Sequence, residues 1–504
     1  MKPLQRTSVT VKQRDNVTPT NPTSRITNPE LRLTAEWVVQ AMGEAGARLT
    51  TGASDREFSG VSIDTRTVAP GELFVAIRGE RFDGAEFAAA AIEKGAAGVV
   101  VPRGRFTTPP FGVAERPSAP VVIEAEDTIV ALQALARTIR RKSDAKVIAI
   151  TGSAGKTTTK EVAAELLALR YRVIRNRGNL NNHIGLPLSL IELRLRPEVA
   201  VVELGMNHAG EISTLVRIAE PDVRVWTNVG DAHLGFFSSV DAIADAKAEI
   251  LERATPSTAL VANADDERIA ARLRATSFPG RIVTFGIDRD ADVRATEVVD
   301  RGIDGTTAHV TASEKTVQMA VPLVGRANLS NVLAAAAIAL EFGIPLTAIA
   351  DRVARVSPAT HRGEIVRLSS GMTIVDDSYN ANPSAMKQAL EILARTEATR
   401  RVAVLGEMLE LGDHARRLHE DVGRAAARNR IDLLFVVGGD AAGAMAEAAV
   451  AAGMPREAVR YFRTIENAAA SIVAGVERGD LVLVKGSRGV KTDRVVERLK
   501  AERG

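Results

Sequence analysis

The feature that most constrains the fold is a segment of small residues, residues 151–160 (TGSAGKTTTK), between two periodic stretches. Residues 146–151 have the apolar composition of a buried strand, and residues 158–169 carry Val162, Leu166 and Leu169 at helical spacing. Small residues let backbone N–H groups approach a polyphosphate, and the amino end of the next helix adds partial positive charge. A strand, a phosphate loop and a helix in this order predict an α/β domain that binds ATP.

The loop departs from the common phosphate-loop motif at one position, because Ile150 stands where the first glycine is expected. The alternative is an ordinary glycine-rich turn, but the Gly-Lys-Thr at the helix start favours ATP binding. Lys156 is expected to reach the β- and γ-phosphates, and the Thr157 hydroxyl to ligate Mg²⁺. The predicted ATP-binding residues of the loop are Gly152, Ser153, Ala154, Gly155, Lys156, Thr157 and Thr158.

Strand and helix patterns divide the chain into a tail and three α/β segments, residues 1–30, 31–145, 146–356 and 357–504. The tail is rich in Thr, Asn, Pro and Ser, and we expect it to be disordered. In the second and third segments, short apolar runs alternate with helices, which is typical of mostly parallel sheets. These runs are residues 146–151, 199–204, 223–228, 258–263, 372–376, 401–405, 433–437 and 481–484.

Composition and charge exclude several classes of protein. Cysteine is absent, which excludes a disulfide scaffold, a Cys-ligated zinc site and a cysteine nucleophile. Residues 1–30 hold five Lys or Arg and two Asp or Glu, which accounts for the whole net charge of +3. The rest of the chain is neutral and predicts no nucleic-acid partner. The longest apolar run, residues 332–340, is too short to span a membrane and the first residues lack a signal pattern, so we expect a cytoplasmic protein.

Two side chains near strand ends are candidate metal ligands. Glu203 ends the run 199–204, and His233 follows the run 223–228. The carboxyl ends of neighbouring parallel strands meet at one edge of the sheet, where the phosphate loop also lies. A loop histidine is most often solvated or hydrogen-bonded, but a position beside Glu203 and Lys156 favours a metal ligand. We therefore expect one Mg²⁺ on Thr157 and Glu203 and a second near His233.

Several motifs, in order along residues 60–495, resemble the Mur ligases, the ATP-dependent enzymes that build the peptide of bacterial peptidoglycan. They are residues 151–160, 203–212 (ELGMNHAGEI), 232–234 (AHL), 246–250 (AKAEI), 377–383 (DSYNANP) and 406–412 (GEMLELG). The last two resemble the member that adds D-alanyl-D-alanine to the UDP-N-acetylmuramoyl tripeptide. The resemblance implies an N-terminal UDP-sugar-binding α/β domain, a central ATPase domain with a mostly parallel sheet, and a C-terminal Rossmann-like domain.

The resemblance also implies roles for residues outside the phosphate loop. Arg362 is similar to the family's C-terminal arginine that reaches the phosphates, and Asp377 to the carboxylate that holds the ATP ribose. Asn328 and Asn331 would pair with adenine, although Ala327 stands where the family often has His. The implied UDP-sugar-binding residues are Ser62, Asp64, Thr65, Arg66, Asn182 and His183. Without the resemblance, residues 62–66 would equally fit an ordinary surface turn, and a solvated turn would be the favoured interpretation of residues 376–377.

Lys247 lies on an apolar helical stripe with Ile243, Ile250 and Leu251. A lysine there extends to water, finds a partner or changes its chemistry, and extension to water is the ordinary outcome. In several Mur ligases the matching lysine carries a carbamate formed with CO₂. The resemblance therefore implies that Lys247 is a catalytic residue and a metal ligand in carbamylated form.

The implied reaction joins the tripeptide to D-alanyl-D-alanine through an acyl phosphate, with ATP and Mg²⁺, in peptidoglycan precursor synthesis, on which cell wall, shape and division depend. Lys156, Lys247 and Arg362 are the expected catalytic residues. Lys485 and Arg488, after the last strand, are candidate partners for the dipeptide carboxylate. The alternatives are an ATPase that acts as a switch and another amide ligase, such as folylpolyglutamate synthase or a different Mur enzyme. We expect a monomer.

Overall fold

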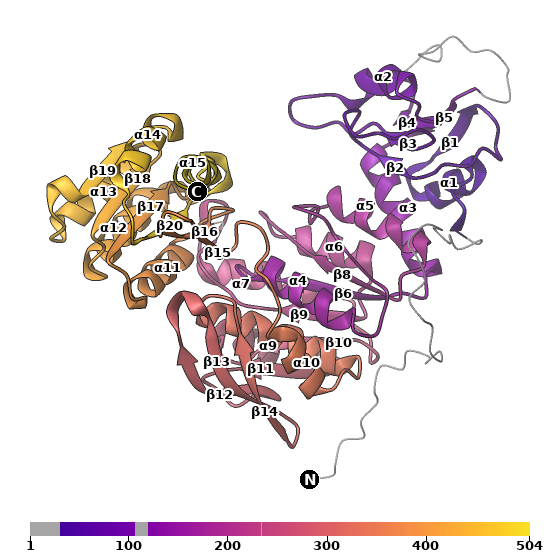
Figure 1. Cartoon of the computed structure of the whole chain (residues 1–504). Coiled ribbons are helices and arrows are strands. Elements are labelled where there is room, and N and C mark those ends of the chain that lie inside the picture. The colour runs from indigo at the N-terminus through magenta and orange to yellow at the C-terminus, as the bar shows by residue number, and fades with distance from the viewer. Residues whose placement is uncertain (1–30, 106–118, 233) are drawn as a thin grey trace.

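The computed structural model describes residues 31–105, 119–232 and 234–504, which form three α/β domains along the chain (Figure 1). Each domain has its own sheet, of five, nine and six strands. The three-domain α/β fold is therefore confirmed, whereas the exact domain boundaries stay a prediction. The expectations for residues 1–30 and for His233 concern positions outside the described residues.

The N-terminal domain is built on a sheet of order β1-β5-β4-β3-β2, in which β1 is antiparallel to β5 and the other neighbours are parallel. The strands are β1 (Arg48–Thr51), β2 (Val61–Ser62), β3 (Leu73–Val75), β4 (Gly98–Pro102) and β5 (Val121–Ala125). The helices are α1 (Ala35–Ala41), α2 (Ala88–Glu93) and α3 (Thr128–Lys142). The Asp127 side chain caps α3, which leads directly to the middle domain.

The middle domain has a sheet of order β14-β13-β12-β11-β10-β9-β6-β8-β7. The strands are β6 (Lys146–Thr151), β7 (Val173–Arg175), β8 (Val199–Glu203), β9 (Val223–Trp226), β10 (Ala259–Asn263), β11 (Arg281–Gly286), β12 (Val293–Asp300), β13 (Thr306–Ala312) and β14 (Lys315–Val321). The helices are α4 (Lys156–Leu167), α5 (Gly185–Ile191), α6 (Glu211–Ala219), α7 (Val240–Ala248), α8 (Glu267–Ala275), α9 (Arg326–Glu341) and α10 (Leu346–Val353). Neighbours from β7 to β12 are parallel, and β13 and β14 extend the sheet as antiparallel strands.

Both faces of the middle sheet are covered, which explains why its strands are apolar at successive positions. Ile148 and Ile150 of β6 pack with α4, α9 and α10, whereas Val147 and Ala149 face α5, α6 and α7. The apolar run 332–340 lies inside the buried helix α9. Within residues 31–105, 119–232 and 234–504, no helix is long and apolar enough to cross a membrane.

The C-terminal domain has a sheet of order β15-β16-β20-β17-β18-β19, parallel except for β15. The strands are β15 (Glu364–Arg367), β16 (Thr373–Asp377), β17 (Arg400–Gly406), β18 (Leu433–Val437), β19 (Val459–Phe462) and β20 (Asp480–Lys485). The helices are α11 (Pro383–Arg395), α12 (Ala415–Arg428), α13 (Asp440–Ala451), α14 (Ile465–Gly475) and α15 (Asp493–Arg503).

The predicted helix after the phosphate loop was placed two residues too late. α4 begins at Lys156 and ends at Leu167. Val162 and Leu166 are buried as expected, but Leu169 lies beyond the helix and is 49% exposed, so its assignment to the buried stripe was wrong. The apolar spacing identified the buried face, but the glycine at the start of the helix determines where α4 begins.

Candidate active site

The phosphate loop connects β6 to α4 and depends on two glycines. Gly155, at the amino end of α4, has a φ of +81°, and a Cβ there would lie 2.0 Å from Asn331 Oδ1. A Cβ on Gly152 would lie 1.9 Å from Thr227 Oγ1. A side chain at either position would collide with the strand end or with α9, so the close packing of the loop requires glycine at both.

The loop is held by the residues that directly follow β9. The Ala154 N–H donates to Asn228 Oδ1 at 2.9 Å, and Asn228 Nδ2 donates back to the Ala154 carbonyl at 3.0 Å. The Thr227 hydroxyl donates to the same carbonyl at 2.8 Å. The Gly230 N–H donates to Ser153 Oγ at 2.9 Å. Sequence reasoning missed Asn228, although a polar amide after a strand beside the phosphate loop was a usable signal.

Lys156 is the first residue of α4, and its ammonium turns back over the loop. Lys156 Nζ donates to the Gly152 carbonyl at 2.6 Å, where a phosphate could replace that carbonyl as its partner. Burial lowers the pKa of Lys156, the Glu203 carboxylate opposes this shift, and the positive charge of Arg362 adds to it. A desolvated cation at this position interacts strongly with a polyphosphate.

Glu203 ends β8 beside the loop, as expected, and is paired with a lysine that sequence reasoning missed. Lys160 Nζ lies 3.1 Å from Glu203 Oε1, and both side chains are buried. The two side chains do not form a hydrogen bond, and Glu203 Oε1 has no hydrogen-bond partner among the described residues. Lys160 Nζ instead donates to the Asn176 carbonyl at 2.9 Å. Glu203 therefore keeps an oxygen available for a further ligand.

The residues that could hold Mg²⁺ are few. Thr157 and Glu203 lie at the same sheet edge, but the described part of the chain contains no group of three His, Asp or Glu side chains arranged to hold a metal. Magnesium is commonly bound by one or two protein oxygens together with substrate phosphates and water. The hydroxyl of Thr157 and the free oxygen of Glu203 fit this chemistry.

Lys247 lies on α7 and is 1% exposed. Burial lowers the pKa of Lys247 well below its ordinary value, and the positive charge of Lys156 lowers it further. Among the described residues, none forms a hydrogen bond or ion pair with its ammonium. The Lys247 side chain therefore does not extend to solvent, which was the ordinary alternative. A buried, unpaired amine with a depressed pKa is favoured in its neutral, nucleophilic form.

Arg362 reaches the phosphate loop from the C-terminal domain. Its Nη2 lies 3.4 Å from Thr157 Oγ1, and its guanidinium lies 4.1 Å from the centre of the Tyr379 ring. The buried Arg362 Nε has no hydrogen-bond partner within the described part of the chain. The preceding residue, His361, has a φ of +61°, and its Nδ1 is hydrogen-bonded to the buried Asp376 Oδ2 at 2.7 Å. His361, Asp376 and Tyr379 were not identified from the sequence.

Asp377 and Lys485, for which we predicted separate roles, form an ion pair. Lys485 Nζ donates to Asp377 Oδ2 at 2.5 Å and to the Asn380 carbonyl at 3.1 Å, and the lysine side chain is only 4% exposed. Arg488 stacks on Tyr379 at 5.0 Å and forms no ion pair with a carboxylate among the described residues. Arg488 is therefore the freer cation of the two dipeptide candidates.

The two expected adenine-binding asparagines lie in the first two turns of α9. Asn331 Nδ2 donates to Asn328 Oδ1 at 3.1 Å, and Asn328 Nδ2 donates to the Val324 carbonyl at 2.9 Å. Asn331 also packs against Gly155 of the phosphate loop. Both amides therefore lie at the ATP side of the sheet, already partly engaged with each other.

The expected uridine-binding residues lie apart from this site, in the N-terminal domain (Figure 1). Asp64 pairs with Arg66 at 2.6 Å, and hydrogen bonds from Arg66 lower the pKa of Asp64 to about 2. The Ser62 hydroxyl donates to the Asp64 carbonyl at 3.2 Å, and Lys94 Nζ donates to the Thr65 carbonyl at 2.7 Å. These contacts hold the turn after β2 in a fixed shape.

Asn182 and His183 lie just before α5 and make local contacts. Asn182 Oδ1 accepts from the N–H groups of Ile184 and Gly185, at 3.2 and 2.8 Å, and so caps the start of α5. The His183 carbonyl accepts from Gln133 Nε2 of α3 at 3.0 Å. The structure thus gives Asn182 a capping role in addition to the expected substrate contact.

The middle and C-terminal domains touch close to the site. The Ser384 hydroxyl donates to Asp231 Oδ1 at 3.0 Å, and the Gly235 N–H donates to the Glu410 carbonyl at 2.8 Å. Glu410 belongs to the GEMLELG motif at residues 406–412. This motif therefore forms part of the contact between the domains.

A phosphate loop that is completed by an arginine from the next domain is the arrangement of a ligase-like, ATP-binding site. Comparison with protein families shows to which class of ligase the chain belongs. Residues 57–146 match the Mur ligase family catalytic domain, residues 150–339 the Mur ligase middle domain, and residues 361–488 the Mur ligase glutamate ligase domain. The chain belongs to the Mur ligase family.

Individual relatives and solved structures indicate which members of the family this chain is similar to. The chain is 37% identical to the UDP-N-acetylmuramoyl-tripeptide--D-alanyl-D-alanine ligase of Treponema pallidum, over 91% of this chain and 97% of the relative. It is 33% identical to the enzyme of the same name from Bacillus subtilis, over 87% and 93%. Among solved structures it resembles MurF from Acinetobacter baumannii, with a TM-score of 0.81 and 30% identity over 94% of this chain and 99% of the other. MurF from Thermotoga maritima in complex with ADP gives a TM-score of 0.76 and 28% identity over 88% and 97%.

Proposed function

We propose that this protein is an ATP-dependent ligase that joins D-alanyl-D-alanine to UDP-N-acetylmuramoyl-tripeptide. The observation that carries the proposal is the composite site, in which Arg362 of the C-terminal domain lies 3.4 Å from Thr157 of the phosphate loop. A site completed by a second domain suits a reaction that brings three substrates together. The relatives that match most of the chain have this activity as their name.

The proposed reaction activates a carboxylate that would otherwise be a poor acyl donor. The terminal carboxylate oxygen of the tripeptide attacks the γ-phosphorus of ATP, the bond to the bridging oxygen breaks, and ADP leaves. The amine of D-alanyl-D-alanine then attacks the acyl phosphate carbon and loses a proton. Phosphate leaves from the tetrahedral intermediate, and an amide remains. Lys156 and Arg362 neutralise the phosphoryl oxygens and keep them in line, which is the main task of a phosphoryl-transfer site.

Magnesium, when bound, would neutralise charge on the phosphates. The proposed ligands among the described residues are Thr157 and Glu203, whose Oε1 has no hydrogen-bond partner. His233 stays a predicted ligand for a second ion. Lys160 Nζ, 3.1 Å from Glu203 Oε1, would help to fix the position of this side chain at the strand end.

Lys247 is proposed to act as a carbamate. Its neutral amine attacks the carbon of CO₂, a C–N bond forms, and the amine loses a proton to solvent. The product is an anion where the lysine had been a cation. Burial and the nearby Lys156 both disfavour the ammonium form of Lys247, so both favour this exchange.

The remaining substrate contacts follow the domains. We propose that the uridine diphosphate binds at Ser62, Asp64, Thr65 and Arg66, with Asn182 and His183 facing the sugar. Adenine is proposed to bind at Asn328 and Asn331 and the ribose at Asp377, whereas Arg488, with Lys485 behind it, binds the dipeptide carboxylate. Because the proposed substrate is a nucleotide-activated precursor, we expect a cytoplasmic enzyme, and we expect a monomer.

The test is a ligation assay with purified protein, ATP, Mg²⁺ and UDP-N-acetylmuramoyl-tripeptide, with the third residue either lysine or diaminopimelate. We expect ADP release and a product whose mass has grown by one D-alanyl-D-alanine unit. Matched reactions offer D-glutamate, lysine or diaminopimelate with their shorter UDP-sugar acceptors, and glutamate with a folate. Phosphate release without an amide product, or faster ligation of one of the other amines, would overturn the proposal.

A further inference from the structure

A cavity of about 280 Å³ lies at the amino ends of the central strands of the middle sheet. Its lining includes Asp222, just before β9, and Thr258, just before β10. The phosphate loop follows the carboxyl end of β6, so the cavity is at the opposite edge of the sheet. Helices α3 and α6 also line it, and α3 comes from the N-terminal domain. None of the proposed substrate contacts uses this cavity.

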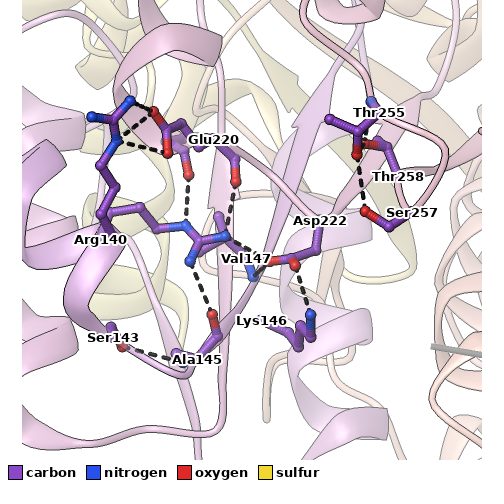
Figure 2. Close-up of polar contacts among 12 residues, drawn as sticks. Arg140, Ser143, Ala145, Lys146, Val147, Glu220, Asp222, Thr255, Ser257 and Thr258 are labelled. Atoms are coloured by element: carbon purple, nitrogen blue, oxygen red, sulfur yellow. Dashed lines mark hydrogen bonds and ion pairs between the residues drawn. The ribbon is translucent and has the colours of Figure 1, made fainter. Parts of the chain in front are cut away.

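The two carboxylates that line the cavity are already paired with cations. Figure 2 shows Asp222 between Arg140 and Lys146, and Glu220 beside an arginine of α3. The distances are 3.1 Å for Arg137–Glu220, 2.7 Å for Arg141–Glu220, 2.7 Å for Arg140–Asp222 and 2.8 Å for Lys146–Asp222. These carboxylates therefore do not neutralise the other arginines of the lining.

The positive charges of two further arginines of the lining are compensated little or not at all by neighbouring groups. Arg253 is exposed and forms no hydrogen bond or ion pair within the described part of the chain. Arg217 makes one weak contact, from its Nη2 to Gln133 Oε1 at 3.4 Å. An amide oxygen carries no net charge, so both guanidinium charges remain available to a ligand.

Arg224 adds a third positive charge from the wall of the cavity. It is 2% exposed, and its Nη1 donates to the backbone carbonyls of Ile250 and Glu252. Its Nε has no hydrogen-bond partner among the residues that the structure describes. Burial lowers the pKa of Arg224 to about 10, while the Glu252 carboxylate opposes the shift. The group is thus still charged at neutral pH. A buried charge that forms no ion pair is unfavourable, and an anion bound beside it would reduce that cost.

Hydroxyl groups complete the lining. Thr255 and Ser257 are exposed, and their hydroxyls lie 2.9 Å apart (Figure 2). Thr258 Oγ1 accepts from the Thr255 N–H at 3.0 Å, which fixes the turn before β10. Guanidinium and hydroxyl groups both donate hydrogen bonds to phosphate oxygens. A phosphate has more acceptor oxygens than a carboxylate, so it can accept from more of these donors at once.

We propose that this cavity binds a small phosphorylated anion. Its volume is near the lower limit of about 300–1,000 Å³ for small-molecule sites, which suits a phosphate or diphosphate and not a macromolecule. Such an anion would contact Arg217, Arg224 and Arg253, together with the hydroxyls of Thr255 and Ser257. Because α3 lines the same cavity, the bound anion would also stabilise the contact between the N-terminal and middle domains.

The test is titration calorimetry with inorganic phosphate, pyrophosphate and succinate at constant ionic strength. Saturation of the phosphate loop with a non-hydrolysable ATP analogue and Mg²⁺ keeps that loop from contributing. The test protein is the double variant Arg217→Gln and Arg253→Gln, which leaves the buried Arg224 in place. The matched control is Arg355→Gln, an exposed arginine of the same domain with no side-chain contact among the described residues. Melting curves without ligand check that each variant folds.

We expect wild type and Arg355→Gln to bind phosphate or pyrophosphate with one site, and the double variant to bind at least about tenfold more weakly, since each lost guanidinium removes charged hydrogen bonds. Tighter binding of pyrophosphate would identify a diphosphate ligand, and tighter binding of phosphate a monophosphate; either supports the proposal. Equal affinities in the double variant and wild type would overturn it. Succinate binding as tight as that of either phosphate would overturn the assignment to phosphorylated anions.

Discussion

Replacement of Arg362 by alanine tests whether the C-terminal domain contributes to the chemical step. Arg362 Nη2 lies 3.4 Å from Thr157 Oγ1, while the buried Nε has no partner and remains available to a phosphoryl oxygen. The residue lies just before β15, in a different domain from the loop it contacts. We therefore expect its charge to act on the transferring phosphoryl group and not on binding of the UDP-sugar.

The expected decrease in kcat of Arg362→Ala follows from the kind of contact that is lost. A preorganised donor on a developing charge contributes about 2.7–4 kcal/mol to transition-state stabilisation. The distance of 3.4 Å is at the long end for a hydrogen bond, so the lower limit applies. About 2.7 kcal/mol corresponds to a kcat roughly 100-fold lower in Arg362→Ala. Loss of the stacking on Tyr379 removes about 1–2 kcal/mol of local stability, which is small beside the stability of a whole domain.

The assay is steady-state ADP release with each substrate varied in turn. Arg488→Ala is the matched control, because Arg488 also stacks on Tyr379 but makes no contact with the phosphate loop. We expect Arg488→Ala to keep kcat within about threefold of wild type and to raise the KM for D-alanyl-D-alanine. The KM of Arg362→Ala for the UDP-sugar peptide should change less than about twofold. An unchanged kcat with a raised KM in Arg362→Ala would refute the reasoning.

Three further outcomes are expected. Lys156→Ala should lower ligation more than about 100-fold, measured as amide product, because a preorganised charge on the phosphoryl group is lost; near-normal turnover would exclude the proposed role. Lys247→Arg should be inactive although it keeps the charge, whereas Lys247→Ala should regain activity with added acetate; a fully active arginine variant would exclude the carbamate. Burial lowers the pKa of His419, whose Nε2 accepts from the Met408 N–H at 2.9 Å, so the unfolded chain binds the proton first as pH falls through about 6.5. The stability due to His419 is then present above that pH and lost below it. The melting temperature of His419→Gln should therefore fall less between pH 7 and 5 than that of wild type or of His414→Gln, an exposed control. Parallel pH profiles of the three proteins would contradict this.

Much of the fold could be predicted because its strands are local patterns. β6 and β18 have the predicted bounds, and the other central strands agree to within one or two residues. Each such strand is buried on both faces by helices, so its residues are apolar in succession and stand out in the sequence. The strands β12 to β14 at one end of the middle sheet were missed, because partly exposed strands carry Thr, Arg and Lys between their apolar residues and resemble loops.

The site could be predicted where its functional residues lie in one continuous segment. The prediction was incomplete where residues from separate segments come together. Residues 152–158 form one continuous loop, so their composition alone indicated phosphate binding. Asn228 donates to and accepts from that loop, but it is more than 70 residues away. The pairs Lys160–Glu203 and Asp377–Lys485 depend on which strands become neighbours in the sheets. Single-sequence periodicity does not contain that information.

The direction of Arg362 depends on contacts that only the folded chain provides. His361, just before it, adopts a left-handed conformation with a φ of +61°, which costs about 1–2 kcal/mol for a residue with a Cβ. Its hydrogen bond to the buried Asp376 at 2.7 Å offsets this strain, and the Tyr379 N–H donates to the His361 carbonyl at 3.2 Å. The end of β16 thus fixes the backbone from which Arg362 extends, and Tyr379 supports its guanidinium. Because Asp377, next to Asp376, is the proposed ribose ligand, the same strand end would couple nucleotide binding to the position of the arginine.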